Sequence, residues 1–401
     1  MSKVRHITAP AGFVAAGIKC GIKVSGKEDL AVVACERDAA VAIMTTRNQV
    51  FGEPVRYCRD ILPKNFGTAR AIVINSGCSN VCTGQAGYKD AVKMASATAA
   101  ELGTTAQKVL VASTGVIGHR LPMDKILKGI PRAVSQLGTG NDSLALRAIM
   151  TTDTREKYAV ARTTLGGKTV TVGGMVKGAG MIAPSMATMI CVLTTDLAAS
   201  PAVLHKALKQ TIDSSLNAVT IDSDTSTSDT AVLLASGAAG NKPLAAGSAD
   251  FKKFVKALAE VLAQLARAVA ADGEGATKLI TINVRGARSA AEAEIAAKSV
   301  ANSPLFKCAV HGGDPNWGRI ASALGKSAAK VDPAKLVIRV GGVTIFARGR
   351  GLDFDLKKVQ QHLKGKDVHV AADLGLGKGS YTAITCDLSR EYITINADYH
   401  T

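Results

Sequence analysis

The sequence has few aromatic residues and no long apolar run. Aromatic side chains make up 4% of the 401 residues, with one tryptophan, which speaks against a binding surface built from aromatic anchors. No stretch reaches the roughly 18 to 20 consecutive apolar residues that span a bilayer, and the start of the chain lacks the apolar core of a signal peptide. We therefore expect a cytoplasmic protein that does not enter a membrane.

Cysteine and histidine are too scattered for a disulfide framework or a metal centre. Eight cysteines and seven histidines are spread along the chain. Only Cys78 and Cys82 lie close together, and neither a second pair nor histidines at matching spacing accompany them. The isolated histidines also give no sign of a Ser/His triad. We expect reduced thiols and no metal site.

The charge is strongly positive, at +17, yet it is not concentrated in basic blocks. Lysine and arginine are distributed through the chain and are not interleaved with aromatic residues, so nucleic-acid binding is not indicated. A positive field that attracts small anionic substrates explains the charge more simply. With 47% apolar and 20% charged residues, the chain can bury a large core.

Alternating β-prone and helical patterns predict a mixed α and β class with layered sheets and helices. A stripe of apolar residues over 251–269 predicts one helix, and a second pattern over 203–216 follows Pro201. Residues 375–380 predict a turn between strands, and the tryptophan lies in a predicted tight loop at 311–320. Runs rich in Val and Ile predict strands at 31–35, 41–46, 71–75, 109–113, 169–176, 189–194, 279–284, 336–343 and 392–396.

The most informative stretch is residues 177–196, where a glycine-rich segment and a proline precede Ala187 and Thr188. A threonine at the head of a strand can attack its own upstream carbonyl, and hydrolysis of the resulting ester frees it as a new N-terminus. An α-amine with an ordinary pKa of roughly 7.7 to 8 then serves as general base for the neighbouring hydroxyl. Nucleophile and base thus reside in one residue. A plain buried strand that starts after a turn gives the same spacing, and the residues alone favour that simpler interpretation.

Colinear motifs add a second line of argument. The chain resembles the ornithine acetyltransferase family, the bifunctional glutamate N-acetyltransferases of arginine biosynthesis, over nearly its whole length. The motifs that carry the resemblance are INSGCSNVCTG at 74–84, VASTGVIG at 111–118, MTTDT at 150–154, KGAGMIAPSMATM at 177–189, DGEGATK at 272–278, HGGDPNWGRI at 311–320 and INADYHT at 395–401.

The resemblance implies that the chain cleaves itself between Ala187 and Thr188. Thr188 then attacks the acetyl group of N2-acetyl-L-ornithine, becomes acetylated, and passes the acetyl group to L-glutamate. The family places the donors to the developing oxyanion at Thr114 and Gly115, and each such donor contributes about 3 to 4 kcal/mol. In the sequence these two residues end a strand-like run, where glycine permits unusual dihedral angles, although a simple strand-to-turn transition gives the same pattern.

The family's substrate ligands also match positions in this chain. Lys177 would pair with the substrate α-carboxylate, and Glu274 with the side-chain ammonium of ornithine. Ordinary interpretations are a solvated loop lysine for Lys177 and a turn or capping carboxylate for Glu274. The family's threonine ligand matches Thr152, but the adjacent Thr151 leaves the register of this match open by one residue. The ligands at the C-terminus can reach the site only if the chain end is docked against it. The matching residues are Thr152, Lys177, Thr188, Glu274, Asn396 and Thr401.

The resemblance further implies an α/β (α+β) fold, a layered α-β-β-α sandwich with a smaller C-terminal α/β domain. Residues 1–187 would form an α chain, and residues 188–401 a β chain that carries the nucleophile and the C-terminal domain. Two of each would assemble into a heterotetramer, with no metal and no organic cofactor. Some members of the family also use acetyl-CoA, and the sequence leaves open whether this chain does.

The chain departs from the family pattern at a few positions. Ser185 stands where asparagine is common, and Ser79 and Val81 vary the 74–84 segment. These changes leave acetyl transfer intact but bear on the efficiency of self-cleavage. Two other hypotheses stand beside the first. One is an amidase or aminopeptidase with the same N-terminal nucleophile and water as acceptor, and the other is an uncleaved basic protein that binds nucleic acid.

Overall fold

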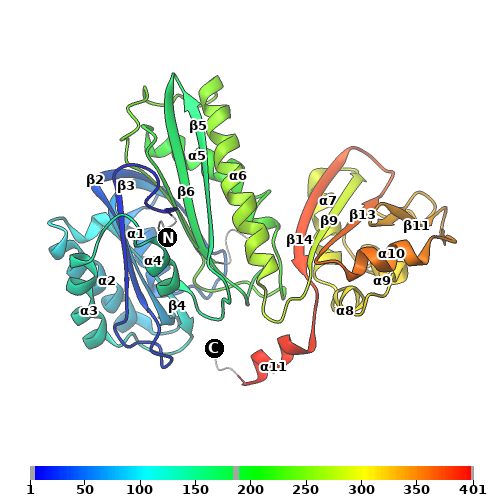
Figure 1. The fold of residues 1–401 in the computed structure, drawn as a ribbon, viewed down its shortest axis with the longest axis horizontal. Helices are drawn as coiled ribbons and strands as arrows, with labels where there is room; N and C mark the ends of the chain where they lie inside the picture. Colours follow the sequence, from blue (N-terminus) through cyan, green and yellow to red (C-terminus); the bar gives the residue numbers. More distant parts are fainter. Residues whose placement is uncertain (1–4, 184–188, 399–401) are drawn as a thin grey trace.

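The computed structural model describes residues 5–183 and 189–398 of the chain. Its larger unit has eight strands, with helices on both sides (Figure 1). The strands are β1 (Phe13–Ile18), β2 (Leu30–Thr45), β3 (Phe66–Cys78), β4 (Val109–Val116), β5 (Lys157–Leu165), β6 (Lys168–Lys177), β7 (Ile190–Thr195) and β8 (Thr230–Ala235). The helices are α1 (Glu53–Ile61), α2 (Gly84–Glu101), α3 (Met123–Ser135), α4 (Asp142–Ile149), α5 (Pro201–Ile212) and α6 (Ala249–Ala271), with single turns of 3₁₀ helix at η1 (Ala106–Lys108) and η2 (Leu216–Ala218).

Strand β2 joins two groups of strands in this unit. The hydrogen-bonded order is β4-β3-β2-β8-β7-β6-β5, with β1 also paired to β2. The first half of β2 pairs with β1 and its second half with β8, and an irregularity between Ala34 and Ala39 separates the two halves. The two strands predicted at 31–35 and 41–46 are therefore one long, irregular strand.

The elements stack in layers. The interior core contains buried residues of β1 to β4 together with inward-facing residues of β6, β7 and β8, such as Met175, Val192 and Val232. Helices α1 to α4 cover the β1 to β4 side, and α5 and α6 pack on the opposite side of the other strands. Figure 1 shows this order as α2 and α3, then β2 and β3, then β5 and β6, then α6. The prediction of a layered α/β fold is confirmed.

Helix α6 shows why the larger unit folds as predicted. Its N-cap Ser248 accepts a hydrogen bond from the Phe251 amide, which satisfies one free donor of the first turn. Its apolar stripe is buried from Phe251 to Val269 against β5 and β6. The predicted helix over 251–269 is confirmed. The second predicted helix forms α5, with Pro201 in the first turn, and ends at Ile212.

The smaller unit follows α6 and has its own sheet and core. Its six strands have the order β12-β11-β10-β13-β9-β14. The predicted turn at 375–380 connects β13 to β14 and is confirmed, whereas the run at 336–343 is two strands joined by a turn. The elements are β9 (Leu279–Ala287), α7 (Ala290–Ala301), α8 (Pro304–Gly312), α9 (Trp317–Gly325), β10 (Val337–Val340), β11 (Val343–Ala347), β12 (Arg350–Gly351), α10 (Leu356–Lys364), β13 (Asp367–Asp373) and β14 (Gly379–Cys386).

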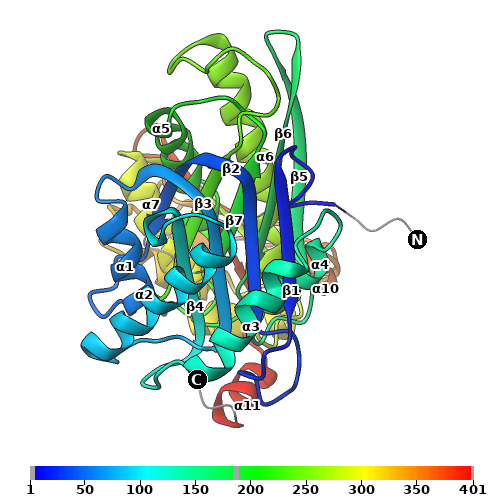
Figure 2. The same cartoon turned by 90° about the vertical axis from the view of Figure 1, so that its left-hand side faces the viewer.

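The last element, α11 (Arg390–Asp398), corrects one prediction. Residues 392–396 are a helix and not a strand, because no strand edge pairs with them and their β-prone side chains have no sheet face to pack on. The helix leaves the smaller unit and lies beneath the larger one, close to the strand ends (Figures 1 and 2). Asn396 on this helix lines the same pocket as Ser79 and Thr114, which precede it by more than 250 positions in the chain.

Candidate active site

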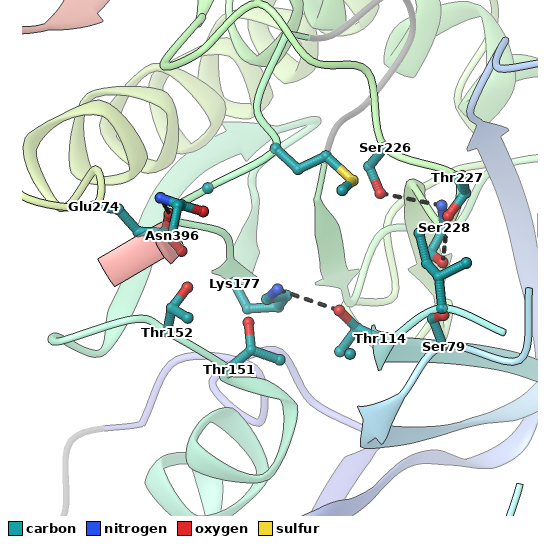
Figure 3. Close-up of a pocket in the computed structure, with 14 residues that line it drawn as sticks. Ser79, Thr114, Thr151, Thr152, Lys177, Ser226, Thr227, Ser228, Glu274 and Asn396 are labelled. Atoms are coloured by element: carbon teal, nitrogen blue, oxygen red, sulfur yellow. Dashed lines mark hydrogen bonds between the residues drawn. The ribbon is translucent and has the colours of Figure 1, made fainter. Parts of the chain in front are cut away.

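One pocket collects every described residue that the sequence predicted for the site. Its walls come from the end of β4, the segment after α4, the end of β6, the segment after α6, and α11 (Figure 3). The predicted residues that line it are Thr114, Gly115, Thr152, Lys177, Glu274 and Asn396. Thr151 lines it as well, so both alternatives for that position face the same space.

Other predicted positions lie outside the described residues. These are the cleavage pair Ala187 and Thr188, the C-terminal Thr401, and Ser185. The carbonyl of Met189 accepts a hydrogen bond from the Thr230 amide at 2.9 Å. Strand β7 begins at Ile190, two positions after Thr188 in the sequence.

The end of β4 contributes Thr114 and Gly115 to the wall of the pocket. Thr114 is buried, and Gly115 follows with φ of +126°, a conformation that side chains with a Cβ rarely adopt. A Cβ at Gly115 would also lie 2.4 Å from the carbonyl carbon of Gly77 on neighbouring β3. Only glycine fits here, and the backbone turn that it allows faces the pocket beside the Thr114 side chain.

Lys177 ends β6 and is buried inside the pocket at 9% exposure. Its Nζ donates a hydrogen bond to Thr114 Oγ1 at 3.2 Å (Figure 3). Burial lowers the pKa of this ammonium, and the charge of Asp153 opposes that shift. The interpretation of Lys177 as a solvated loop lysine is therefore wrong. A buried cation in contact with a hydroxyl is suited to bind an anionic group.

A buried ion-pair network behind Lys177 was not predicted from the sequence. Lys157 Nζ lies 2.5 Å from Asp153 Oδ1 and 2.5 Å from Asp272 Oδ2, and all three side chains are at most 3% exposed. Asp153 also accepts the Gly178 amide at 2.6 Å. Burial alone would raise the pKa of Asp153, but Lys157, Lys177 and this hydrogen bond lower it to about 2.

The network fixes three segments that carry pocket residues. Asp272 accepts the Thr154 amide at 3.1 Å and so connects the segment after α6 to the segment after α4. Asp153 connects that second segment to the end of β6 through Gly178. The sequence signal was limited to two aspartates inside the MTTDT and DGEGATK motifs. Nothing in the sequence indicated that Lys157 joins them.

Glu274 and Asn396 meet at the opposite end of the pocket (Figure 3). Asn396 Nδ2 donates to Glu274 Oε2 at 2.9 Å, and the Glu274 amide donates to the Ala179 carbonyl at 2.9 Å. A Cβ at Gly180 would lie 2.4 Å from Glu274 Oε2, so glycine is needed for the carboxylate to rest there. Glu274 is 8% exposed, which argues against a simple turn carboxylate.

Close packing also holds α11 in place. Gly275 has φ of +68°, and a Cβ there would lie 2.5 Å from the Tyr392 amide nitrogen. The Ser389 hydroxyl donates to the Gly275 carbonyl at 2.6 Å. The predicted docking of the C-terminal segment against the site is therefore confirmed as far as Asn396, although through a helix.

Hydroxyl groups to which the sequence argument gave no role in the site line the remaining wall. Ser79, Ser226, Thr227 and Ser228 face the pocket, and the Ser228 amide donates to Ser226 Oγ at 3.1 Å (Figure 3). A run of Ser, Thr and Asp at 222–230 was the available signal. Its composition resembles that of many exposed turns, which is why it did not stand out.

The arrangement offers a cation, a carboxylate and several hydrogen-bond donors within one pocket. That set complements a small molecule with both a carboxylate and an ammonium group, such as an amino acid. Within residues 5–183 and 189–398, no group of three or more His, Cys, Asp or Glu side chains is arranged to hold a metal ion. In the same described residues no helix is both long and apolar enough to cross a membrane.

Comparisons with known proteins agree with this site. The chain is 45% identical over 397 residues to the arginine biosynthesis bifunctional protein ArgJ of Symbiobacterium thermophilum, covering 98% of each chain. It is 42% identical to the protein of the same name from Geobacillus kaustophilus, covering 98% of this chain and 96% of that one. A crystal structure of arginine biosynthesis bifunctional protein argJ from Bacillus halodurans is 37% identical, with a TM-score of 0.50, over 51% of this chain and 97% of the solved chain. The family model described as ArgJ family matches residues 14–401, and the chain therefore belongs to the ArgJ family.

Proposed function

We propose that this chain is an acetyltransferase of arginine biosynthesis that moves the acetyl group of N2-acetyl-L-ornithine to L-glutamate. The observation that carries the proposal is the pocket itself. It gathers Thr114, Lys177 and Glu274 from separate segments, and Lys177 pairs in the sheet with Ile190, the first residue of β7. Six residues that the resemblance assigned to the reaction thus face one space.

The first step is self-cleavage between Ala187 and Thr188. The Thr188 hydroxyl attacks the Ala187 carbonyl, the C–N bond breaks, and the acyl group passes from nitrogen to oxygen. Water then hydrolyses the ester, which releases the Ala187 carboxylate and restores the hydroxyl. The products are an α chain of residues 1–187 and a β chain whose first residue is Thr188. The free α-amine of Thr188 becomes the base for the next reaction.

In the transfer step, Thr188 Oγ attacks the acetyl carbonyl while the α-amine accepts its proton. The oxyanion that forms is stabilised by the Thr114 hydroxyl and the Gly115 backbone amide, at a positive φ that glycine adopts readily. The proton then passes to the departing α-nitrogen of ornithine, and an acetyl-threonine ester remains. The α-amine of glutamate attacks this ester in the same way, giving N-acetylglutamate and the free enzyme.

Two charged residues orient the substrates. Lys177 pairs with the α-carboxylate common to acetylornithine and glutamate, and its buried position makes that pairing strong. Glu274, held by Asn396, pairs with the side-chain ammonium of ornithine. Either Thr151 or Thr152 supplies a further hydroxyl contact, because both face the pocket.

Chain length in a relative supports the cleavage. The solved Bacillus halodurans chain aligns over 97% of its length with 51% of this chain, so it is about half as long. One product of cleavage before Thr188 would have that length. We further propose that two α and two β chains form a heterotetramer in the cytoplasm, which native mass spectrometry tests by the mass of the intact assembly.

The decisive experiment combines intact mass with an acetyl-transfer assay. Wild type should give two chains that break between Ala187 and Thr188, and should form N-acetylglutamate from acetylornithine and glutamate. Thr188→Ala should remain one chain and transfer nothing. Turnover by Thr188→Ala would show that another residue is the nucleophile. Release of acetate without N-acetylglutamate would instead identify a hydrolase.

A second variant tests the substrate side of the pocket. Glu274→Gln should cleave normally but show a raised KM for acetylornithine, because the amide no longer offsets the ornithine ammonium. Loss of cleavage in Glu274→Gln would make the residue structural. The word bifunctional in the relatives' name motivates a parallel assay with acetyl-CoA as donor, in which N-acetylglutamate formation would add a second activity.

A further inference from the structure

Asp222 is a half-buried carboxylate that takes no part in the steps above. It lies in the segment between η2 and β8, and it contacts two other segments that reach the pocket separately. Its two oxygens accept the Met181 amide at 2.6 Å and the Ile182 amide at 2.8 Å. The Tyr392 hydroxyl of α11 donates to the same carboxylate at 3.4 Å. Asp222 therefore connects the segment after β6 to the C-terminal helix.

Met181 lines the substrate pocket in a backbone conformation that needs support from outside. Its φ is +55°, in the left-handed region that side chains with a Cβ rarely adopt. Such a conformation persists where the surrounding structure fixes it. The carboxylate of Asp222 binds the amides of Met181 and Ile182, and the Ile221 amide donates to the Ile182 carbonyl at 2.6 Å. Asp222 thus helps to fix Met181 in the pocket wall.

Helix α11 is held by a small number of contacts. None of its described side chains is fully buried, and Ile393 is 66% exposed. A helix of this length is marginal by itself in water. In the part of the chain that the structure describes, two side chains of α11 form hydrogen bonds outside the helix. These are Tyr392, which binds Asp222, and Asn396, which binds Glu274.

The two anchoring side chains of α11 are also connected to each other. Tyr392 and Asn396 are four residues apart and so face the same side of the helix. Asn396 Nδ2 donates to the Tyr392 carbonyl at 2.9 Å as well as to Glu274. Burial and the charges of Asp222 and Glu274 raise the pKa of the Tyr392 hydroxyl, which therefore stays protonated and donates. A chain of contacts runs along α11 from Asp222 to Glu274.

We propose that Asp222 is a positioning residue that holds Met181 and α11 around the pocket, so that Glu274 meets the side-chain ammonium of acetylornithine. The inference rests on the proposed function, because that function assigns the ammonium to Glu274. Without the bond to Asp222, α11 keeps one of its two side-chain anchors and aims Glu274 less well. Glutamate carries no side-chain ammonium, so its binding depends less on this contact.

The first test is Tyr392→Phe, which removes only the hydroxyl group. The variant should cleave as wild type does. Its KM for acetylornithine should rise by about three- to tenfold, which corresponds to the loss of one hydrogen bond. Its kcat should not change, and its KM for glutamate should change less than its KM for acetylornithine. Equal changes in the two KM values would contradict positioning by Asp222, because a general weakening of the fold would affect both substrates.

A double variant tests whether Tyr392 acts through Asn396. If it does, the effects of Tyr392→Phe and Asn396→Ala on the KM for acetylornithine should not multiply, because each change releases the same carboxylate of Glu274. The double variant should then resemble the more impaired of the two single variants. Effects that multiply in full would show that Tyr392 does not act through this chain of contacts.

Asp222→Asn tests the carboxylate itself. Asparagine has one acceptor oxygen, whereas Asp222 accepts the Met181 and Ile182 amides on separate oxygens. The KM for acetylornithine should rise at least as much as in Tyr392→Phe. A wild-type KM in folded Asp222→Asn would overturn the inference. Tyr392→Phe leaves both amide bonds in place, so it decides the question where Asp222→Asn does not fold.

The matched control is Tyr88→Phe. The Tyr88 hydroxyl donates to Asp60 Oδ2 at 2.9 Å, and neither residue lines the pocket. Its KM for acetylornithine should equal that of wild type. The same value in Tyr392→Phe would overturn the inference, while cleavage and transfer by wild type would leave the proposed function standing. A wild type that forms no N-acetylglutamate would overturn both. Calorimetric titration with L-ornithine repeats the comparison without turnover, and equal affinities of wild type and Tyr392→Phe would again contradict the inference.

Discussion

Lys177 interacts with two buried carboxylates that the fold treats differently. Asp153 shares Lys157 with Asp272 and accepts a backbone amide, so its charge is fully compensated. Asp229 is just as buried but has no hydrogen-bond partner among the described residues. Their pKa values accordingly move in opposite directions, down to about 2 for Asp153 and well upward for Asp229.

The difference separates scaffold from chemistry. A compensated buried charge holds its surroundings rigidly, and here it aligns the three segments that carry Thr152, Lys177 and Glu274. An uncompensated one, as at Asp229, destabilises the folded chain, because no partner offsets the burial of the group. The contrast can be tested first at the buried charges of Lys157 and Asp153, where the largest effects are expected, and last at the exposed Asn396 on α11.

The largest effect is expected from Lys157→Met. Removal of the shared cation leaves Asp153 and Asp272 buried, close together and unpaired, which should lower the free energy of unfolding by about 3 to 5 kcal/mol. Urea denaturation measures it. The control is Lys298→Met, whose partner Glu294 lies on the helix surface and whose loss should cost less than about 1 kcal/mol. Equal effects would mean that the buried network is not the scaffold.

The next largest loss of stability is expected from Asp153→Asn, and the size of this loss depends on pH. A carboxyl whose pKa is lowered in the folded state contributes stability above its unfolded value, and that contribution is lost as pH falls through about 2. Asp153→Asn should thus be about 2 kcal/mol less stable than wild type at pH 7. The gap should narrow as pH falls from about 4 towards 2. A gap that does not change with pH would show that packing, and not charge, is responsible.

Much of this site was predictable from the sequence, because its residues lie in motifs that appear in order along the chain. Thr114, Lys177 and Glu274 were named from such motifs and face one pocket. Helix α6 was predictable because its apolar stripe alone dictates which face is buried. Local patterns of this kind require no knowledge of distant contacts.

What could not be predicted depends on contacts between distant residues. Strands β6 to β8 and helices α5 and α6 lie between Lys157 and Asp272 in the sequence, and no local pattern marks the two residues as a pair. Residues 392–396 have β-prone side chains but form part of α11. This segment packs against Gly275 and does not pair with the edge of a sheet. Asp229 was overlooked because a run of Ser, Thr and Asp looks like an exposed turn until β8 buries it.

On the other side of the contrast, Asp229→Asn should not destabilise the uncleaved chain. In a Thr188→Ala background the stability of the variant relative to its parent should be higher at pH 9 than at pH 4, because the parent's contribution is lost above the unfolded pKa of about 3.9. The sign follows from the raised pKa of Asp229, whose contribution to stability is present at low pH and lost as pH rises through the folded value. Thermal unfolding at the two pH values measures it. A loss of stability comparable to that of Asp153→Asn would show that Asp229 is compensated after all.

The smallest effect is expected at the rim, from Asn396→Ala. Asn396 is exposed on α11 and contributes one hydrogen bond to Glu274, so its removal should change the free energy of unfolding by less than about 1 kcal/mol. The KM for acetylornithine should nevertheless rise severalfold, because Glu274 loses the group that aims it. The control is Thr394→Ala on the same helix, whose hydroxyl bonds only the Arg390 carbonyl and does not face the pocket. Initial-rate kinetics give the KM for acetylornithine of both variants. Equal KM values would place Asn396 outside the binding site, and the contrast between scaffold and chemistry would then hold only for the buried charges around Lys177.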